Sequence, residues 1–357
     1  MPSYRVETPQ RCYSAIVERG AMARTAEHIP HKTGKVFVVT TGDVWRYVGE
    51  RMEAGLGGVP HEILYLPGGE DRKRLAPVEQ LAEEMVARGG DRSSLVIACG
   101  GGIVNDMGGF LAAIFMRGIP VLQVPTTLLS QVDAGIGGKT GVNLVSGKNL
   151  IGAFHQPLAV IADPAVLETL PEREYRAGLH EIVKAGIIRE AGLFRFLERE
   201  RDSVIARRPD ALDYIIAESV RMKAEVVSSD EREGGLRRIL NFGHTFGHAL
   251  EAETGYTRFL HGEAVAWGMR AAVYLGESTG HVSADDAAEM MEVIEAYGPI
   301  PPLDGIRADN LAARLVRDKK TLHGNVHFVL PVRIGEVTVV AGIDERMVLE
   351  AIGSALA

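Results

Sequence analysis

The sequence of 357 residues predicts an α/β domain over residues 1–170 and a mainly α-helical domain over residues 171–357. Three observations lead to this prediction. Short β-branched apolar runs alternate with amphipathic stretches in the first domain, as expected for a parallel sheet with helices on both faces. A run of three glycines directly follows one of the apolar runs. Beyond residue 171, apolar residues recur at every third and fourth position, a spacing that predicts helices.

The elements of the two domains follow in order along the chain. In the first domain, strands are predicted over 35–41, 61–69, 93–102 and 120–127, and helices over 43–54, 76–90 and 105–118. The helix over 76–90 ends at a glycine pair, a common helix stop. In the second domain, helices are predicted over 172–200, 211–230 and 263–278, and strand candidates are few until 326–340.

Composition limits the classes of function. The hydrophobic content of 46% and the charged content of 24% are ordinary for a globular protein. A net charge of −8 argues against nucleic-acid binding, so an anionic ligand would need a local basic pocket. No apolar run has transmembrane length and the first residues have no signal-peptide core, which predicts a cytoplasmic protein without membrane contact. Cys12 and Cys99 are predicted to be buried thiols rather than a disulfide.

The glycines Gly100, Gly101 and Gly102 stand where a predicted strand passes into a helix. Backbone N–H groups at such a helix start can bind a phosphate. The stretch is not the dinucleotide fingerprint G-x-G-x-x-G, because Asn105 occupies the place of the third glycine. A tight turn without a ligand and a nucleotide-binding turn therefore both remain open.

The stretch over 132–149 contains "GGKT" but lacks the first glycine of a phosphate-binding P-loop, since Asp133 stands there. Lys139 and Lys148 each follow a glycine, and Asn149 adds an amide. A solvated loop is the simple interpretation. Isolated lysines among glycines and apolar residues favour binding of an anion or a polyol.

Three histidines and a glutamate suggest a metal site. His244 and His248 lie one helical turn apart, and His261 lies beside Glu263, just before the helix predicted over 263–278. Glu181 lies three residues before Lys184 among apolar residues, which predicts a partly buried pair rather than a surface ion pair. Two histidines and a carboxylate with an open position can bind a divalent metal. The pattern alone does not say which two histidines would be ligands.

Seven ordered stretches between residues 35 and 335 together resemble the 3-dehydroquinate synthases, a family of sugar-phosphate cyclases. They are "GGGIVNDMGGF", "FMRGIPVLQVPTTLLSQVDAGIGGKTGVN", "GKNLIGAFHQP", "ETLPEREYRAGLHEIVKAG", "KAEVVSSDEREGGLRRILNFGHTFGHALE", "LHGEAVAWGM" and "RDKK". The resemblance implies a Rossmann-like NAD-binding α/β domain followed by a helical metal-binding domain.

The resemblance also implies roles for individual residues. Zinc, or cobalt, would be bound by Glu181, His244 and His261. NAD would contact Asp43, Glu70, Lys73, Gly101, Asp106, Thr126, Thr127, Asp133, Lys139, Lys148, Thr169 and Leu170. The catalytic set would be Lys139, Lys184, Lys223, Glu233, Arg237, Asn241 and His248. Substrate would be bound by Arg117, Asp133, Lys148, Asn149 and Lys320, with Lys319 as the alternative to Lys320.

Arg117 resembles the arginine that reaches a neighbouring subunit's phosphate pocket in this family, so a homodimer is implied. Two positions depart from the family pattern. Thr41 or Asp43 stands where Asp or Asn often binds the adenosine ribose. His180 replaces a small residue beside Glu181 and is interpreted as a packing variant rather than an extra ligand.

The implied reaction converts 3-deoxy-D-arabino-heptulosonate 7-phosphate, a small anionic sugar phosphate, to 3-dehydroquinate and phosphate in the shikimate pathway. Its steps would be transient oxidation by NAD, phosphate elimination, reduction and an intramolecular aldol closure, which makes the enzyme a carbon–oxygen lyase acting on phosphates. Other cyclases, such as aminodehydroquinate, 2-deoxy-scyllo-inosose and 2-epi-5-epi-valiolone synthases, remain alternatives. A metal-dependent polyol dehydrogenase and a catalytically silent NAD-binding protein are more distant ones.

Overall fold

The computed structural model describes residues 3–319 and 326–357, which form two compact units. The first unit comprises Met1–Tyr175 and Leu212–Arg232. The second comprises Arg176–Ala211 and Glu233–Ala357. The boundary predicted between residues 170 and 171 remains a proposal about domains, and the compact units differ from it by placing the segment 212–232 with the first unit.

A seven-stranded sheet forms the first unit, with the spatial order β1-β2-β9-β6-β5-β3-β4. Its strands are β1 (Ser3–Glu7), β2 (Cys12–Val17), β3 (Val36–Thr40), β4 (His61–Tyr65), β5 (Leu95–Gly100), β6 (Val121–Pro125) and β9 (Ala159–Ala162). All neighbours pair in parallel except β1 and β2, which form an antiparallel hairpin at one edge. The predicted parallel sheet is therefore confirmed. Strands β1, β2 and β9 were not predicted.

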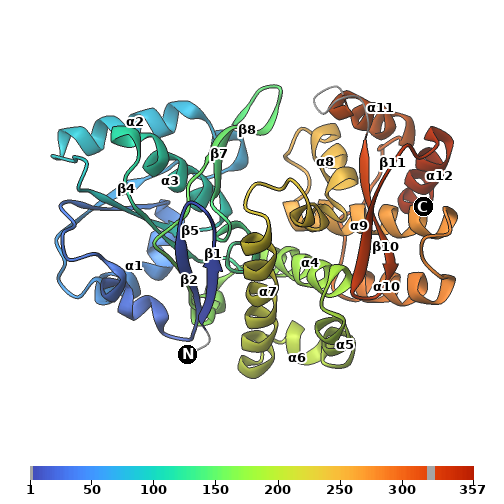
Figure 1. Ribbon diagram of the computed structural model, residues 1–357, viewed down its shortest axis with the longest axis horizontal. Coiled ribbons are helices and arrows are strands. Elements are labelled where there is room, and N and C mark those ends of the chain that lie inside the picture. The colour runs from blue at the N-terminus through green and yellow to red at the C-terminus, as the bar shows by residue number, and fades with distance from the viewer. Residues whose placement is uncertain (1–2, 320–325) are drawn as a thin grey trace. The chain divides into compact units, whose positions relative to one another are not determined.

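The core of this unit lies between the sheet and its helices. Every residue of β3 and β5 is buried, as continuous apolar runs of central parallel strands require. Helices α2 (Leu75–Ala87) and α3 (Gly102–Ile114) pack their apolar residues against one face, where Phe37, Val96 and Met107 belong to one cluster. Helix α1 (Gly42–Leu56) lies on the other side of the sheet from α2 (Figure 1). Alternate helices on opposite faces follow from right-handed crossovers.

The stretch predicted as a loop over 132–149 is instead a short 130–134 helical turn followed by a hairpin. Strands β7 (Lys139–Leu144) and β8 (Gly147–Phe154) pair in antiparallel fashion. Gly141 pairs with Gly152, and a Cβ atom on Gly152 would lie 2.2 Å from the carbonyl oxygen of Thr140. The glycines that suggested a loop are required because the two backbones approach closely.

The second unit is mainly helical, as predicted. Its helices are α4 (Glu172–Ile188, which begins in the first unit), α5 (Ala191–Arg199), α6 (Arg201–Ile205), α8 (His244–Glu253), α9 (His261–Ser278), α10 (Ala284–Ala296), α11 (Ala308–Lys319) and α12 (Glu345–Leu356). Strands β10 (His327–Arg333) and β11 (Glu336–Ala341) form a hairpin. The single helix predicted over 172–200 is divided into α4 and α5, and the predicted helix over 211–230 is α7 (Pro209–Ser229).

Two further predictions concern the whole chain. Within residues 3–319 and 326–357, no helix combines the length and the apolar composition needed to cross a bilayer. Both cysteines are free thiols. Cys99 is buried as predicted, but the predicted burial of Cys12 is wrong, because Cys12 is an exposed residue at the start of β2.

Candidate active site

The carboxyl edge of the parallel sheet gathers the residues predicted to bind NAD. Each parallel strand from β3 onward is followed by at least one of them: Asp43 after β3, Glu70 and Lys73 after β4, Gly101 and Asp106 after β5, Thr126 and Thr127 after β6, and Thr169 and Leu170 after β9. The chain passes from β3 outward to β4 and then returns to β5 on the other side of β3. Such a switch point is where open α/β sheets bind ligands.

The glycine turn follows β5 at this switch point. A Cβ atom on Gly100 would lie 2.5 Å from the side chain of Val104, so only glycine fits there. Gly101 directly precedes α3, and a Cβ atom on it would lie 3.1 Å from the methyl group of Thr127. No side chain caps the start of α3. The free N–H groups of this helix start, together with its dipole, favour a phosphate.

Lys73 is buried, and its side chain connects α3 to β8. Its Nζ atom donates to Oδ2 of Asp106 at 2.5 Å and to Oδ1 of Asn149 at 2.6 Å. Burial raises the pKa of the Asp106 carboxyl, and the Lys73 ammonium opposes this effect. The ammonium thus fixes a carboxylate on α3 and an amide on β8, both of them predicted site residues.

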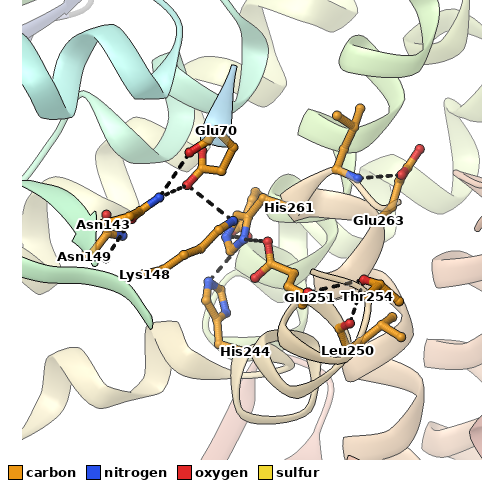
Figure 2. A network of polar contacts seen from close by, with 12 residues as sticks. Glu70, Asn143, Lys148, Asn149, His244, Leu250, Glu251, Thr254, His261 and Glu263 are labelled. Carbon is orange, nitrogen blue, oxygen red and sulfur yellow. Dashed lines mark hydrogen bonds and ion pairs between the residues drawn. The ribbon is translucent and has the colours of Figure 1, made fainter. Parts of the chain in front are cut away.

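Asn143, which no sequence pattern singles out, joins this group. Its Nδ2 atom donates to Oε1 of Glu70 at 2.8 Å, and its Oδ1 accepts from the backbone N–H of Asn149 at 2.8 Å. Lys148 Nζ lies 3.6 Å from the same Glu70 oxygen. Figure 2 shows Asn143 and Lys148 converging on Glu70. The buried amide of Asn143 therefore orients Glu70 and Asn149 together.

The remaining predicted residues of the first unit have varied surroundings. Lys223, buried on α7, donates to the backbone oxygen of Asp133 at 2.6 Å and contacts its carboxylate. A hydrogen bond from Thr41 lowers the pKa of Asp43, which is exposed. Lys139 is exposed at the start of β7. Arg117 is exposed with a left-handed φ of 68°.

In the second unit, Glu181, His244 and His261 are brought together from three helices, α4, α8 and α9. Oε1 of Glu181 lies 3.7 Å from Nε2 of His244 and 3.8 Å from Nε2 of His261. The donor atoms of all three lie within 4.8 Å of one another. His248, in contrast, does not belong to this group. Its donor atom lies within that distance of His261 and Glu251 instead.

This donor set fits a divalent metal. The Glu181 side chain is 1% exposed and forms a buried ion pair with Lys184. Apart from this ion pair, neither of its oxygens accepts a hydrogen bond from any described residue. A buried carboxylate needs compensation, and two imidazoles facing it with Nε2 atoms supply the remaining ligands of a His/His/Glu site.

Close packing of helix backbones brings these ligands together. A Cβ atom on Gly262 would lie 1.8 Å from the carbonyl oxygen of Ala177 on α4, and one on Gly247 would lie 2.9 Å from the carbonyl oxygen of Ala264 on α9. Similarly, Gly268 of α9 approaches the backbone oxygen of Gly243. These glycines allow the backbones of α4, α8 and α9 to approach closely.

The other residues of this unit predicted to bind or convert substrate differ in their burial and contacts. Glu233, with a left-handed φ of 62°, accepts a hydrogen bond from Asn241 at 2.5 Å. Arg237 is fully buried and His248 is exposed. Lys320 lies outside the described residues, and the side chain of the alternative Lys319 is likewise not described.

His180 is buried, and burial lowers the pKa of its imidazole to about 4. Neither ring nitrogen has a hydrogen-bond partner among the described residues. It belongs to neither group of potential metal ligands found there. Its surroundings are therefore those of a neutral packing residue.

A Rossmann-like sheet with a phosphate turn and a helical unit with a His/His/Glu group are typical of enzymes that combine a dinucleotide with a divalent metal. The comparisons narrow this class. The family model for the 3-dehydroquinate synthase N-terminal domain matches residues 63–177, and the family model for the C-terminal domain matches residues 178–321. The chain belongs to the 3-dehydroquinate synthase family.

Individual relatives agree with this family. A 3-dehydroquinate synthase from Solibacter usitatus is 76% identical over 357 residues, with 100% of both chains covered. Among solved structures, 2-epi-5-epi-valiolone synthase from Streptomyces hygroscopicus, with NAD+ and Zn2+ bound, is 29% identical with a TM-score of 0.88 over 96% of both chains. A 2-deoxy-scyllo-inosose synthase complexed with carbaglucose-6-phosphate, NAD+ and Co2+ is 27% identical with a TM-score of 0.90 over 99% of both chains.

Proposed function

We propose that this protein catalyses the 3-dehydroquinate synthase reaction, which converts 3-deoxy-D-arabino-heptulosonate 7-phosphate to 3-dehydroquinate and phosphate. The observation that carries the proposal is the 76% identity, over the full length of both chains, to a curated 3-dehydroquinate synthase. The His/His/Glu group with its buried glutamate and the glycine turn at the sheet edge support it from the structure.

The cofactors follow from the relatives and from the fit of the residues. NAD and a divalent metal, zinc or cobalt, would occupy the two sets of residues described above. When bound, NAD accepts and returns a hydride at a secondary alcohol of the substrate, and the metal lowers the pKa of that alcohol. Glu181, His244 and His261 would hold the metal, and Gly101 with the start of α3 would hold the pyrophosphate.

The chain's own side chains would manage protons and anions. We assign Asn241 and His248 to the proton of the reacting hydroxyl, because Glu233 orients the Asn241 amide and His248 presents an exposed imidazole one turn after His244. Imidazole is suited to proton transfer near neutral pH. Lys184 would neutralise the charge of the Glu181 carboxylate through their buried ion pair.

Cations would bind the two anionic ends of the substrate. We assign Lys148, Asn149, Arg237 and Lys320 to the phosphate, and Lys139 and Lys223 to the carboxylate. The buried Arg237 offers the fork of donors that suits a phosphate. Local cations of this kind explain how a chain of net charge −8 could bind an anion.

Several finer statements belong to the same proposal. Loss of phosphate would make the enzyme a carbon–oxygen lyase. The exposed Arg117 would contact the phosphate bound by a second copy, so we propose a homodimer. A cytoplasmic location and a domain boundary between residues 170 and 171 remain part of the proposal.

A related cyclase activity is the main alternative, since two solved cyclases share the fold at 27–29% identity. One assay separates the possibilities: the purified protein receives the heptulosonate phosphate, zinc and trace NAD+, and phosphate, carbocyclic product and NADH are measured. We expect phosphate and dehydroquinate in equal amounts without net NADH. Stoichiometric NADH would indicate a dehydrogenase, and absence of turnover would contradict the proposal.

The metal assignment has its own test. Glu181→Gln should lose bound zinc and turnover together, because it removes the one carboxylate of the set. Glu172→Gln makes the same change at an exposed position in the first turn of α4 and should preserve both. Full zinc occupancy in the Glu181 variant would exclude Glu181 as a ligand.

A further inference from the structure

Resting on the proposed metal site, we infer that Glu251 is a positioning residue that fixes the ring of His261 for metal binding. Glu251 lies on α8, and its side chain is 1% exposed. Its Oε1 atom lies 3.4 Å from Nδ1 of His261. Figure 2 shows the two side chains facing each other from α8 and α9.

The two nitrogens of His261 face different carboxylates. Nδ1 faces Glu251, whereas Nε2 faces Glu181 at 3.8 Å. A neutral imidazole carries one proton, so a hydrogen bond from Nδ1–H to Glu251 leaves the Nε2 lone pair available to a metal. Glu251 therefore selects the tautomer in which His261 can act as a ligand.

His244 shows the same arrangement with a different partner. Its Nδ1 lies 3.2 Å from the backbone oxygen of Phe242, and its Nε2 lies 3.7 Å from Oε1 of Glu181. Both imidazoles thus direct Nδ1 to a protein oxygen and Nε2 to the same carboxylate. Histidine ligands commonly donate their second ring N–H in this way, which fixes the ring and raises its basicity.

The surroundings of His261 explain why it needs this contact. His261 is the first residue of α9, and the backbone there is fixed by a hydrogen bond from Leu260 N–H to the Glu263 carboxylate at 2.7 Å. Glu263 thereby fixes the backbone at the start of α9. The His261 side chain is 27% exposed, against 12% for His244, so packing restrains it less. The contact with Glu251 adds a restraint on this ring.

The decisive measurement is zinc affinity of the full chain, obtained by competition with a chromophoric chelator. Glu251→Ala should weaken zinc binding about 10- to 100-fold, the usual effect of losing such a partner. Glu251→Gln should lose less, because the amide oxygen still accepts from Nδ1–H. The matched control is Glu253→Gln on the same helix, whose carboxylate contacts Asn310 and Arg314 and should leave the affinity unchanged.

A second measurement tests the tautomer without any substitution at Glu251. Long-range 15N–1H spectra of the zinc-free wild-type chain, assigned with His261→Ala, should show His261 protonated at Nδ1. Protonation at Nε2 would overturn the inference, as would unchanged zinc affinity in a folded Glu251→Ala variant. This measurement remains decisive even if that variant fails to fold.

His248, Glu251 and His261 also have donor atoms within 4.8 Å of one another. If Glu251 were itself a ligand, the wild type would bind two zinc ions per chain and His248→Ala would bind one, and the inference would be wrong. If the proposed metal site itself were wrong, the result would differ, because His244→Ala and Glu181→Gln would then retain zinc at wild-type affinity.

Discussion

The substitution Gly262→Ala tests how the helices bring the metal ligands together. A Cβ atom there would lie 1.8 Å from the carbonyl oxygen of Ala177 and 2.5 Å from its carbonyl carbon. Real Cβ contacts almost never fall below 3.0 Å, so the start of α9 must move at least 1.2 Å away from α4 (3.0 − 1.8). Both contacting atoms belong to backbone, so no side-chain rotation can relieve the clash.

The displacement should affect stability and metal binding together. Inserting a methyl group into a packed interface costs about 1–3 kcal/mol, which lowers the melting temperature by about 2–4 °C per kcal/mol in a domain of this size. Glu181 lies one helical turn after Ala177, and His261 precedes Gly262 directly. Metal bonds tolerate deviations of about 0.2 Å, so a shift of this size should weaken zinc binding by at least tenfold.

The assays are thermal unfolding of the zinc-free chain and chelator competition for zinc. Gly353→Ala is the matched control, because Gly353 lies inside α12 and a Cβ atom there meets nothing within 4 Å. That variant should be stabilised by about 0.5–1 kcal/mol and bind zinc normally. A Gly262→Ala variant that melted within 1 °C of the wild type and kept its zinc affinity would show that α4 and α9 do not require glycine at this contact.

Three further predictions concern the first unit. Asn143→Ala should weaken NADH binding by about 1–3 kcal/mol, or about 5- to 150-fold, since buried partners lose their hydrogen bonds; NADH fluorescence titration measures this, and an unchanged dissociation constant would contradict it. Burial raises the pKa of the Cys99 thiol to about 12, so a thiol reagent at pH 8 should modify only the exposed Cys12 in the native chain and both thiols after denaturation; rapid native modification of Cys99 would be inconsistent with its burial. Burial lowers the pKa of the His155 imidazole below its usual 6.5. As pH decreases from 6.5, the unfolded chain therefore binds this proton before the folded chain does, and the free energy of unfolding should fall. Urea unfolding of His155→Gln should show a shallower decline with pH than the wild type, and an identical slope would count against His155 as the cause.

The regular part of the fold could be predicted because its signals are local. Strands β3 and β5 are almost entirely apolar and are followed by polar or glycine residues, and their buried positions require such runs. Strand β9 has only four residues, too few for a distinct pattern. The β7–β8 hairpin was mistaken for a loop because glycine reduces strand propensity, although Gly141 and Gly152 are needed where the two backbones meet.

The candidate site was predictable only in part, for a related reason. Histidines among glycines are rare enough in a sequence to be noticed, but their partners are common residues. Glu251 is an ordinary helical glutamate until α9 places His261 beside it. Asn143 is equally inconspicuous until β7 and the segment after β4 bring it to Glu70. Contacts between residues distant in the chain select these side chains, and no local pattern records such contacts.

The segment 212–232 has a consequence for the order in which the protein can be made. It belongs to the first unit, yet the ribosome synthesises it after residues 176–211 of the second. Lys223 can reach Asp133 only when translation has passed this point. A truncated gene product ending at residue 170 would lack α7 altogether, so it should emerge as an incomplete, aggregation-prone fragment. All seven strands of the sheet are synthesised by residue 162, but the first unit stays incomplete until α7 leaves the exit tunnel, and by then residues 176–211 of the second unit are already part of the nascent chain.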